Sequence, residues 1–556
     1  MLYIEINIKQ VMIWMNVKNL EECLFNRLNL IFIAFLALFI ILGSYLLHFY
    51  QYDLINKDII SMISVARLYA TGNLSDAING YWGPLFSWFL VPSILINSSP
   101  TSVLFSTKVI SLIFGFFTLI GVRLLSYRIK MSEKIRISIL FAMVFVILYF
   151  ALIYSPVDLI LTCFLVYYLY LIFDPNYYKN WYNGALCGIL CGLAYLTKSY
   201  IFPFFIIHFL LFNSFHYFKN IKNKKSIMKN LLVGLALFMI ISGAWSAIIS
   251  DKYNKITFGT SGTYNYDVVG PTSVGHPTEY IYEGFIKPPY ANVTSAWEDP
   301  TYLKVTSWNP FQSKSNFIYQ INKLEYNIQI LISIFELFSY LSLIILLASV
   351  ILSLKSFKKL IADVNILYPL ITILIFSAGY LLILLEARYL WIVFILLMLM
   401  GGYLLELIFK RIKLTNLGET VLIIVFIVSF LITPFSGLIS FHYVGSDGGY
   451  VGKDIYDMSQ TVESQYPVNG NIASNGNEEN GAYRSTLHMS YFLGTNYYGF
   501  SKYNESDSDL KADLTKYGIN YYFVWGNSTN NALLSQYKEV SNGKIPNLRI
   551  YKINTG

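Results

Sequence analysis

Charged side chains are scarce in this chain of 556 residues: Lys, Arg, Asp and Glu make up 13% of it, against 55% hydrophobic residues. That balance excludes an ordinary soluble globular protein. The formal net charge of +8 would suit an anionic partner, but the basic residues cluster in short loops between apolar runs. Such clustering is typical of membrane topology, and we expect no nucleic-acid partner.

Cysteine is also rare, with four residues in the chain. They lie in the N-terminal segment or inside apolar runs, at Cys23, Cys163, Cys187 and Cys191. An oxidising compartment would not reach these positions easily, so we predict no structural disulfide. Cys187 and Cys191 would share a helix face, but no His or acidic residue stands beside them. We interpret them as small packing residues rather than metal ligands.

Long uncharged runs are what the sequence does contain. A bilayer core takes roughly 20 apolar residues per helix, and runs of this kind recur along most of the chain. We predict about eleven transmembrane helices, the first of them uncleaved. Their approximate bounds are 28–49, 103–125, 137–153, 157–173, 184–197, 200–214, 231–249, 329–352, 364–385, 389–409 and 420–440.

The short loops predict the orientation of these helices. Four loops are rich in Lys and Arg, and the count of helices places them on one side, near 128–136, 219–229, 355–359 and 410–413. Such loops stay in the cytoplasm, so we expect segment 1–27 there too. An odd number of helices then leaves the C-terminus outside. The chain is predicted to be a multi-pass protein of the cell membrane, with the lipid bilayer as its solvent.

Three segments are too long and too polar to be simple connectors, namely 50–100, 250–328 and 441–556. The predicted orientation places all three outside, over a transmembrane domain at 28–440. The tail mixes a helical stretch at 454–465 with strand-like runs at 520–525 and 548–553. It is therefore predicted to form a small extracytoplasmic α/β domain.

The first external loop has an ordered set of features. Asp53 and Asp58 follow the first span, and the run ISVARLYATG at 63–72 has helical periodicity. The turn NGYWGPL at 79–85 then opens an apolar helix that continues to Ile96. That helix is too short to span a membrane, so we expect it along the interface.

These features together resemble GT-C glycosyltransferases, in particular the branch of protein O-mannosyltransferases and lipid A aminoarabinose transferases (family 39-like). The first loop contributes an acidic residue after the first span, a helix that ends in a small residue and Gly, and an aromatic-Pro-Leu turn. Further along, SPVD at 155–158 places an acid at the start of the fourth span. GLAYLTK at 192–198 and EARYL at 386–390 resemble the branch's GLAxLTK and ExRYL elements. The resemblance covers residues 28–440.

Two positions depart from the family pattern. Members often carry Asp-Glu and then Tyr at the first acidic position, whereas two isoleucines follow Asp58, which leaves Asp53 as a rival. Trp82, Gly83 and Pro84 stand where some members carry Glu-Lys-Pro. The second departure argues against an aminoarabinose transferase specifically.

The resemblance implies an all-α, GT-C-like membrane glycosyltransferase. Such enzymes transfer a sugar from a polyprenyl-phosphate carrier to an acceptor hydroxyl outside the cytoplasm, with inversion at the anomeric carbon. A carboxylate must take the acceptor proton, and cations must hold the phosphate that leaves with the lipid. Asp58 is the candidate base, with Asp53 as the alternative. Lys198 and Arg388, at predicted outer ends of spans, are the candidate phosphate ligands; the acceptor is a glycan, a lipid or a protein.

Other polar residues are candidates for the same site. Asp158 would orient the acceptor or pair with a cation, and Glu386 is an alternative partner for Arg388. Asp76 is a second acid in the first loop, and Trp82 is a candidate substrate-binding residue.

The second external loop adds Glu298 and Asp299, which either face the acceptor or lie on the loop surface. A metal site would need more convergent ligands than the sequence offers, so we expect no cofactor, with a divalent metal left open.

Other function classes remain as alternatives. A transporter, including a flippase of lipid-linked sugars, would tend to show repeated halves and polar groups near the bilayer midplane, and neither is clear here. A glycan polymerase or ligase would use the same donors on the same face, and product analysis would separate it. A non-enzymatic scaffold fits least well with ionisable residues that gather at the outer ends of spans.

Overall fold

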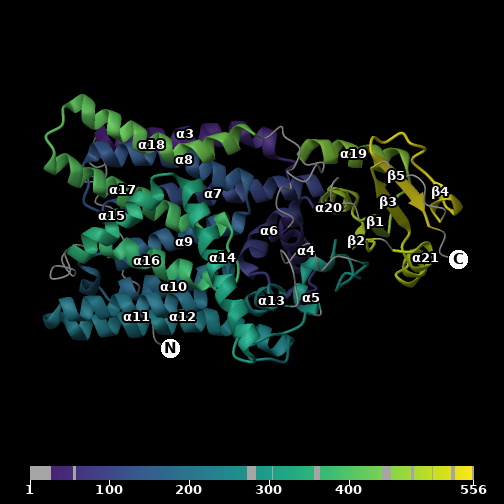
Figure 1. The fold of residues 1–556 in the computed structure, drawn as a ribbon, viewed down its shortest axis with the longest axis horizontal. Coiled ribbons are helices and arrows are strands. Elements are labelled where there is room, and N and C mark those ends of the chain that lie inside the picture. Colours follow the sequence, from purple (N-terminus) through teal and green to yellow (C-terminus); the bar gives the residue numbers. More distant parts are fainter. Residues whose placement is uncertain are drawn as a thin grey trace, which may run out of the picture.

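A computed structural model gives a mostly helical protein with one small sheet near its C-terminus (Figure 1). A bundle of long helices forms the larger part, and the sheet with its helices lies beyond one end of the bundle. The structure describes residues 27–53, 58–271, 284–303, 305–355, 364–440, 452–476, 481–503, 505–526 and 533–553.

Eight helices within these described ranges are long and apolar enough to cross a membrane. They are α3 (Arg27–Tyr50), α7 (Pro100–Ser126), α8 (Glu133–Ile153), α11 (Ile201–Lys219), α12 (Lys224–Lys252), α16 (Val364–Leu381), α17 (Trp391–Arg411) and α18 (Asn416–Ile439). Two predicted spans are shorter apolar helices, α9 (Pro156–Ile172) and α10 (Tyr182–Thr197). Eight such helices are compatible with a multi-pass membrane protein, while the number eleven stays a prediction.

One predicted span is not a straight helix. The run expected at 329–352 is divided between α14 (Lys314–Phe338) and α15 (Ser342–Lys355), whose axes differ by 108°. Ser339 ends α14 in an extended conformation, and its hydroxyl accepts a hydrogen bond from the backbone of Leu341. Hydropathy could not predict this bend, because a break of three residues hardly changes the average over a window.

Glycines determine the closest contact between two helices of the bundle. A Cβ atom on Gly184 or Gly188 of α10 would overlap a backbone carbonyl oxygen of α12, at Asn230 or Gly234. Small residues one turn apart let two backbones approach in this way. Cys187 and Cys191 are buried on the same helix, and the three cysteines in the described ranges are free, whereas Cys23 lies outside them.

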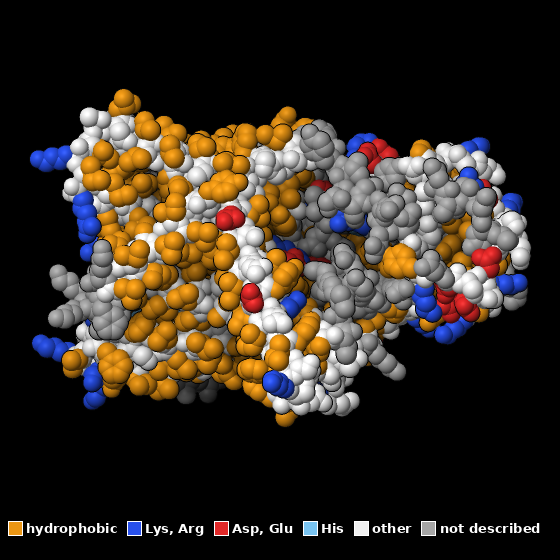
Figure 2. Space-filling model, in the orientation of Figure 1, with side chains coloured by type: hydrophobic (Ala, Val, Ile, Leu, Met, Phe, Trp, Pro, Cys, Tyr) orange, Lys and Arg blue, Asp and Glu red, His pale blue; other side chains and the backbone are white. Residues whose placement is uncertain are grey.

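The basic loops lie at the end of the bundle away from the sheet. Lys134 in the first turn of α8 pairs with Glu419 in the first turn of α18, with 3.5 Å between Nζ and Oε2. The backbone N–H of Ser132 donates to Glu406 near the end of α17. Figure 2 shows Lys and Arg side chains along this end and apolar side chains over the flank of the bundle. The predicted loop around 355–359 lies mostly outside the described residues.

Short helices form a layer at the opposite end of the bundle. They are α4 (Asp58–Ala70), α5 (Leu74–Ala77), α6 (Pro84–Ile96), α13 (Ser261–Val268) and the 3₁₀ turns η3 (Ala296–Glu298) and η4 (Pro300–Tyr302). The helices predicted at 63–72 and 84–96 are thus confirmed as α4 and α6. Pro84 occupies the first turn of α6, where the missing N–H costs nothing.

The tail forms a small α/β unit, as predicted. It contains α19 (Gly452–Gln465), β1 (Asn471–Ser474), α20 (Ala482–Leu493), β2 (Asn496–Phe500), α21 (Asp507–Lys516), β3 (Tyr521–Trp525), η7 (Leu534–Gln536), β4 (Lys538–Glu539) and β5 (Leu548–Lys552). The strand order is β2-β1-β3-β5-β4, with β1 parallel to both neighbours and β5 antiparallel to β3. Strand β2 is therefore an edge strand.

Residues 284–286, which belong to the long segment 250–328, cover that edge. The N–H groups of Gly284 and Ile286 donate to the carbonyls of Phe500 and Tyr498 in β2, at 3.0 and 2.8 Å. Phe285, between them, packs into an apolar cluster of the sheet domain that includes Tyr498. An unpaired edge strand readily adds another strand, and here the added segment comes from the same chain.

Candidate functional site

Arg388 is the centre of a buried ionic cluster at the sheet-side end of the bundle. Its Nη1 atom lies 2.9 Å from Asp58 Oδ2 and 3.8 Å from Asp158 Oδ2. Its Nε atom donates to Glu386 at 2.6 Å. Lys198 joins through Asp158, with 2.9 Å between Nζ and Oδ1. Five residues predicted from distant parts of the sequence therefore meet in one site.

Helix ends place these side chains. Asp58 is the first residue of α4, and Asp158 stands in the first turn of α9, so both carboxylates lie at helix N-termini. Lys198 follows the last residue of α10, at a helix C-terminus. Glu386 precedes the 3₁₀ turn η6 (Ala387–Leu390) that carries Arg388. Acids at N-termini and a cation at a C-terminus are the arrangement that helix dipoles favour.

The cluster carries more acid than base. Three carboxylates face two cations, and Asp58 and Asp158 are only 7% and 3% exposed. Buried charges of this kind are costly unless their partners are complete. Such a network at one end of a helix bundle is therefore a functional candidate, because a packing role would be met at lower cost by apolar side chains.

Tyr389 extends the cluster, in a role that the sequence did not predict. Its hydroxyl donates to Glu386 at 2.8 Å, and the Nζ atom of Lys198 lies 3.5 Å from the centre of its ring. A cation over an aromatic face gains electrostatic attraction that a hydrocarbon wall would not give. The sequence signal that could have indicated this residue is its position directly after Arg388 in the EARYL motif.

Trp297 connects the second external loop to the cluster. Its Nε1 atom donates to Asp58 Oδ1 at 3.1 Å, so both carboxylate oxygens of Asp58 have a donor. Trp82 donates in turn to the backbone carbonyl of Trp297, at 3.1 Å. Trp82 therefore lies beside the site through Trp297. The sequence analysis selected the two acids that follow Trp297 and missed Trp297 itself, because an uncharged indole donor does not stand out in a pattern of charged residues.

Glu298 and Asp299 lie inside the loop rather than on its surface. Glu298 accepts from the N–H of Thr294 at 3.1 Å and from the N–H of Ser295 at 2.9 Å. Asp299 accepts from the hydroxyls of Tyr253 and Tyr290, at 2.6 and 2.8 Å. Burial raises the pKa of Glu298 to about 7, while hydrogen bonds from Ser295 oppose the shift. The alternative that these acids lie on the loop surface is corrected: both are buried and help to fold the loop that carries Trp297, while a role toward the acceptor stays a prediction.

The first-loop turn is packed against the chain segment before Lys198. A Cβ atom on Gly83 would stand 2.5 Å from the carbonyl oxygen of Thr197, which only glycine avoids. Asn79 shapes the same turn, because its Oδ1 accepts from the N–H groups of Tyr81 and Trp82, both at 2.9 Å. The turn thus brings Trp82 close to the end of α10.

Asp53 and Asp76 have their contacts elsewhere. Asp53 is buried and interacts electrostatically with Lys108 of α7, whose Nζ atom also donates to the carbonyl of Leu152 at 2.8 Å. Asp76 lies in α5 and accepts from Asn73 at 2.7 Å. Of the two rival bases, Asp58 is the one that contacts the cluster.

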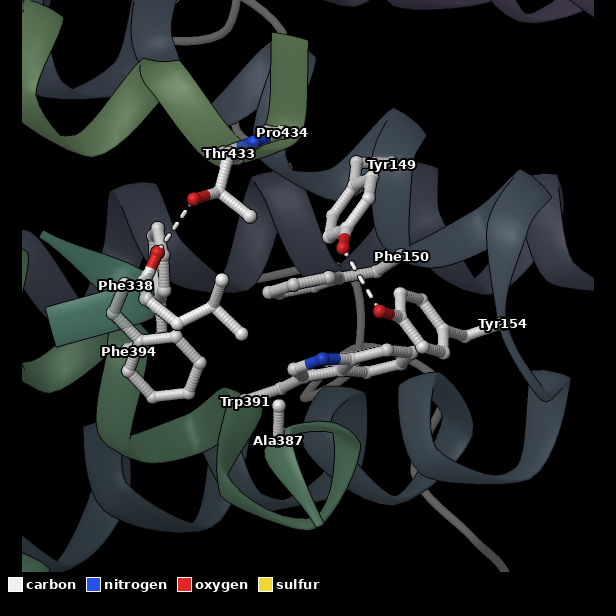
Figure 3. Close-up of a pocket in the computed structure, with 10 residues that line it drawn as sticks. Tyr149, Phe150, Tyr154, Phe338, Ala387, Trp391, Phe394, Thr433 and Pro434 are labelled. Atoms are coloured by element: carbon white, nitrogen blue, oxygen red, sulfur yellow. Dashed lines mark hydrogen bonds between the residues drawn. The ribbon is translucent and has the colours of Figure 1, made fainter. Parts of the chain in front are cut away.

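A small apolar pocket lies behind the turn that carries Arg388. Figure 3 shows Ala387 and Trp391 in its wall, with the ring of Phe150 beside the indole of Trp391. These two rings stack with 4.1 Å between their centres. The hydroxyls of Tyr149 and Tyr154 share a hydrogen bond of 2.9 Å nearby. This packing fixes the back of η6 and so the direction of Arg388.

The sheet domain reaches the cluster through the same loop. The N–H of Tyr497 in β2 donates to the carbonyl of Thr294 at 2.6 Å. Phe500 packs in one apolar cluster with Trp297 and Tyr264. The position of Trp297 therefore depends on a domain that lies about 200 residues later in the chain.

No group of three or more His, Cys, Asp and Glu side chains within the described residues is arranged to hold a metal ion. The three carboxylates of the cluster all surround the guanidinium of Arg388. No model of a known protein family matches this chain, and no curated protein sequence matches it. Its function must therefore be inferred from the geometry of the cluster.

Proposed function

We propose that this protein is an integral membrane glycosyltransferase that transfers a sugar from a polyprenyl-phosphate carrier to an acceptor hydroxyl. The observation that carries the proposal is the contact between Asp58 and Arg388. It joins a candidate base and a candidate phosphate ligand at the end of the bundle covered by the external loops. The resemblance of the first loop and of the segments around Asp158, Lys198 and Arg388 to GT-C glycosyltransferases supports the same reaction.

In the proposed reaction, the donor phosphate replaces some of the carboxylates that contact the two cations. Arg388 and Lys198 contact carboxylates in this structure, and a lipid phosphate would replace some of these contacts with stronger charge-assisted hydrogen bonds. The exchange would also loosen Arg388 from Asp58. A free carboxylate is a better proton acceptor than one paired with a guanidinium.

The bond changes follow from this arrangement. Asp58 takes the proton of the acceptor hydroxyl, whose oxygen forms a bond to the anomeric carbon. The bond between that carbon and the phosphate oxygen breaks on the opposite side, which inverts the anomeric configuration. The electron pair leaves with the lipid phosphate, and Arg388 and Lys198 stabilise the charge.

The proposed orientation keeps the basic loops in the cytoplasm. Loops rich in Lys and Arg remain on that side, so the cluster, the external loops and the sheet domain would face outward. The site would then lie where a lipid-linked sugar presents its head group after translocation.

Transfer by purified protein tests the proposal. The protein in lipid vesicles is given polyprenyl-phosphate-linked sugars and candidate acceptors, and Asp58→Asn is compared with Asp53→Asn. General-base catalysis contributes about a hundred- to ten-thousandfold in rate. The rate of transfer by Asp58→Asn should therefore fall by an amount within or beyond that range, while the variant still binds the donor. Asp53→Asn should be milder, because its carboxylate interacts with Lys108 rather than Arg388.

The result that contradicts the mechanism is equally specific. Full transfer by Asp58→Asn would exclude this residue as the base, and loss only in Asp53→Asn would move the base to that position. Movement of the lipid-linked sugar between leaflets, without any new glycosidic bond, would show that the protein is a flippase rather than a glycosyltransferase.

A further inference from the structure

Helix α14 shows a pattern of exposed side chains that a membrane-crossing helix does not explain. Five exposed polar residues recur at intervals of three or four along one face. They are Asn322, Glu325, Gln329, Ser333 and Glu336. In Figure 2, acidic and other polar side chains lie over α14 within an otherwise apolar surface. Two carboxylates facing acyl chains would be costly.

An apolar flank runs beside this polar stripe. Phe317, Ile321, Ile328 and Ile332 are exposed and share a neighbouring face of the helix. The opposite face is buried against the bundle through Ile334, Phe335 and Phe338. An apolar flank next to a polar stripe is typical of a helix that lies in the membrane interface.

Contacts along α14 keep its successive turns in the sheet-side half of the bundle. Near its start, Tyr319 donates to the carbonyl of Val269, just after α13, at 2.8 Å. In its middle, Asn327 donates to the carbonyl of Leu381, the last residue of α16, at 2.7 Å. Near its end, Leu337 accepts from Thr433 of α18, at 2.6 Å. All three contacts lie toward the sheet side.

A helix that crossed the bilayer would contact its neighbours at opposite ends. With 25 residues, α14 is about 37 Å long, enough to cross the hydrocarbon core. The 108° bend to α15 agrees with a crosswise helix, since α15 packs against the spans α16 and α17. Figure 1 shows α14 running across the bundle.

We propose that α14 lies in the plane of the membrane, in the leaflet on the sheet side, and does not cross the bilayer. Its apolar flank contacts acyl chains, and its polar stripe faces headgroups and water. The exposed apolar faces of the neighbouring spans continue into this flank (Figure 2). Through Asn327, α14 also holds the chain just before Glu386, so it connects this surface to the segment that carries Arg388.

Depth measurements test the proposal independently of any reaction. Single cysteines replace Ile318, Asn322, Glu325, Gln329 and Ser333 in a Cys23→Ser background, and each is spin-labelled in lipid vesicles. Depth is read from the relative accessibility to oxygen and to a water-soluble nickel chelate. The buried native cysteines should label little. An in-plane helix gives depths that agree within about one helical turn, 5 Å.

Helix α12 provides the matched control. Leu232, Met239 and Ile248 are exposed on this long helix, and labels there should show a depth change of about 24 Å over 16 residues. A comparable gradient along α14 would overturn the proposal.

Labels at Ile328 and Gln329 test what the apolar flank and the polar stripe of α14 each contact, acyl chains or headgroups and water. A label at Ile328→Cys should encounter mainly oxygen, and one at Gln329→Cys mainly the nickel chelate. Equal and exclusive accessibility to oxygen at both positions would show that the polar stripe does not face headgroups. Because all these residues are exposed, the substitutions should leave the fold intact, which a shared thermal midpoint would verify.

Discussion

The two ends of the helix bundle both carry charged residues, but they use them differently. At the basic end, the described ion pairs are one-to-one, and in three of the four at least one side chain is well exposed; that of Lys410, which pairs with Glu406, is 65% exposed. At the sheet-side end, Arg388 contacts three carboxylates, and Asp158 holds two cations in a buried network. Exposed pairs contribute little to stability, whereas a buried network is costly when any member is missing. The charged residues of the sheet-side end therefore depend on one another more strongly than those of the basic end.

The largest difference between the two ends should come from removing one cation at each. Arg388→Ala leaves the buried Asp58 and Asp158 and the partly exposed Glu386 without their shared partner, and it should cost about 3–5 kcal/mol as well as donor binding. Lys410→Ala should cost at most about 1 kcal/mol. Thermal midpoints in detergent and binding of a polyprenyl-phosphate sugar measure the two effects. Similar losses for both variants would remove the distinction between the ends.

A pH-dependent difference should follow from the buried Glu298. Its pKa is about 7 in the folded protein, against 4.5 for the ordinary side chain. Between these values the folded state holds a proton that the unfolded state has lost. Stability from this group is therefore present below pH 4.5 and lost as pH rises through 7, by about 2–3 kcal/mol.

Thermal midpoints between pH 5 and pH 8 check this sign. Wild type should lose stability relative to Glu298→Gln as pH rises, because the variant cannot titrate there. Glu419→Gln, at the basic end, provides the control and should follow wild type across the range. A wild type that gains stability over Glu298→Gln on going to pH 8 would contradict the expected sign.

A smaller effect should come from the hydrogen bond between Trp297 and Asp58. Trp297→Phe keeps an aromatic ring but removes the donor to a charged acceptor, which contributes about 1.5–3 kcal/mol. Transfer should slow by about ten- to a hundredfold if that energy positions Asp58. Trp308→Phe, which removes a bond to the carbonyl of Tyr266, is the matched control. Equal kinetics for both variants would argue that Trp297 only packs.

The smallest effect should come from glycine positions. Gly83→Ala forces a Cβ atom against the backbone before Lys198 and should cost about 1–3 kcal/mol. Gly243→Ala on α12 meets open space and should be neutral or slightly stabilising. Thermal midpoints compare the two, and an unchanged midpoint for Gly83→Ala would show that the turn can shift.

The sequence predicts candidate residues best where a short motif stands at the end of an apolar run. Asp158, Lys198 and Arg388 lie in motifs that resemble those of GT-C glycosyltransferases, and Lys198 and Arg388 also stand at predicted ends of spans, which are visible in a linear pattern. Long-range partners leave no such trace, so the hydrogen bond from Trp297 to Asp58 and the burial of Glu298 and Asp299 required the structure. The direction of a helix is also hidden from hydropathy, which is why α14 was predicted as part of a straight span.

The pairing of residues 284–286 with strand β2 has a consequence for biosynthesis. Strand β2 is made about 200 residues after the segment that it holds, and nascent chains fold largely from the N-terminus onward. The helix bundle can therefore assemble while the loop that carries Trp297 still lacks its support. Only when the tail has been made and has folded does Thr294 acquire its partner in β2. A truncated or stalled chain would thus hold Trp297 and the cluster without the support of the tail.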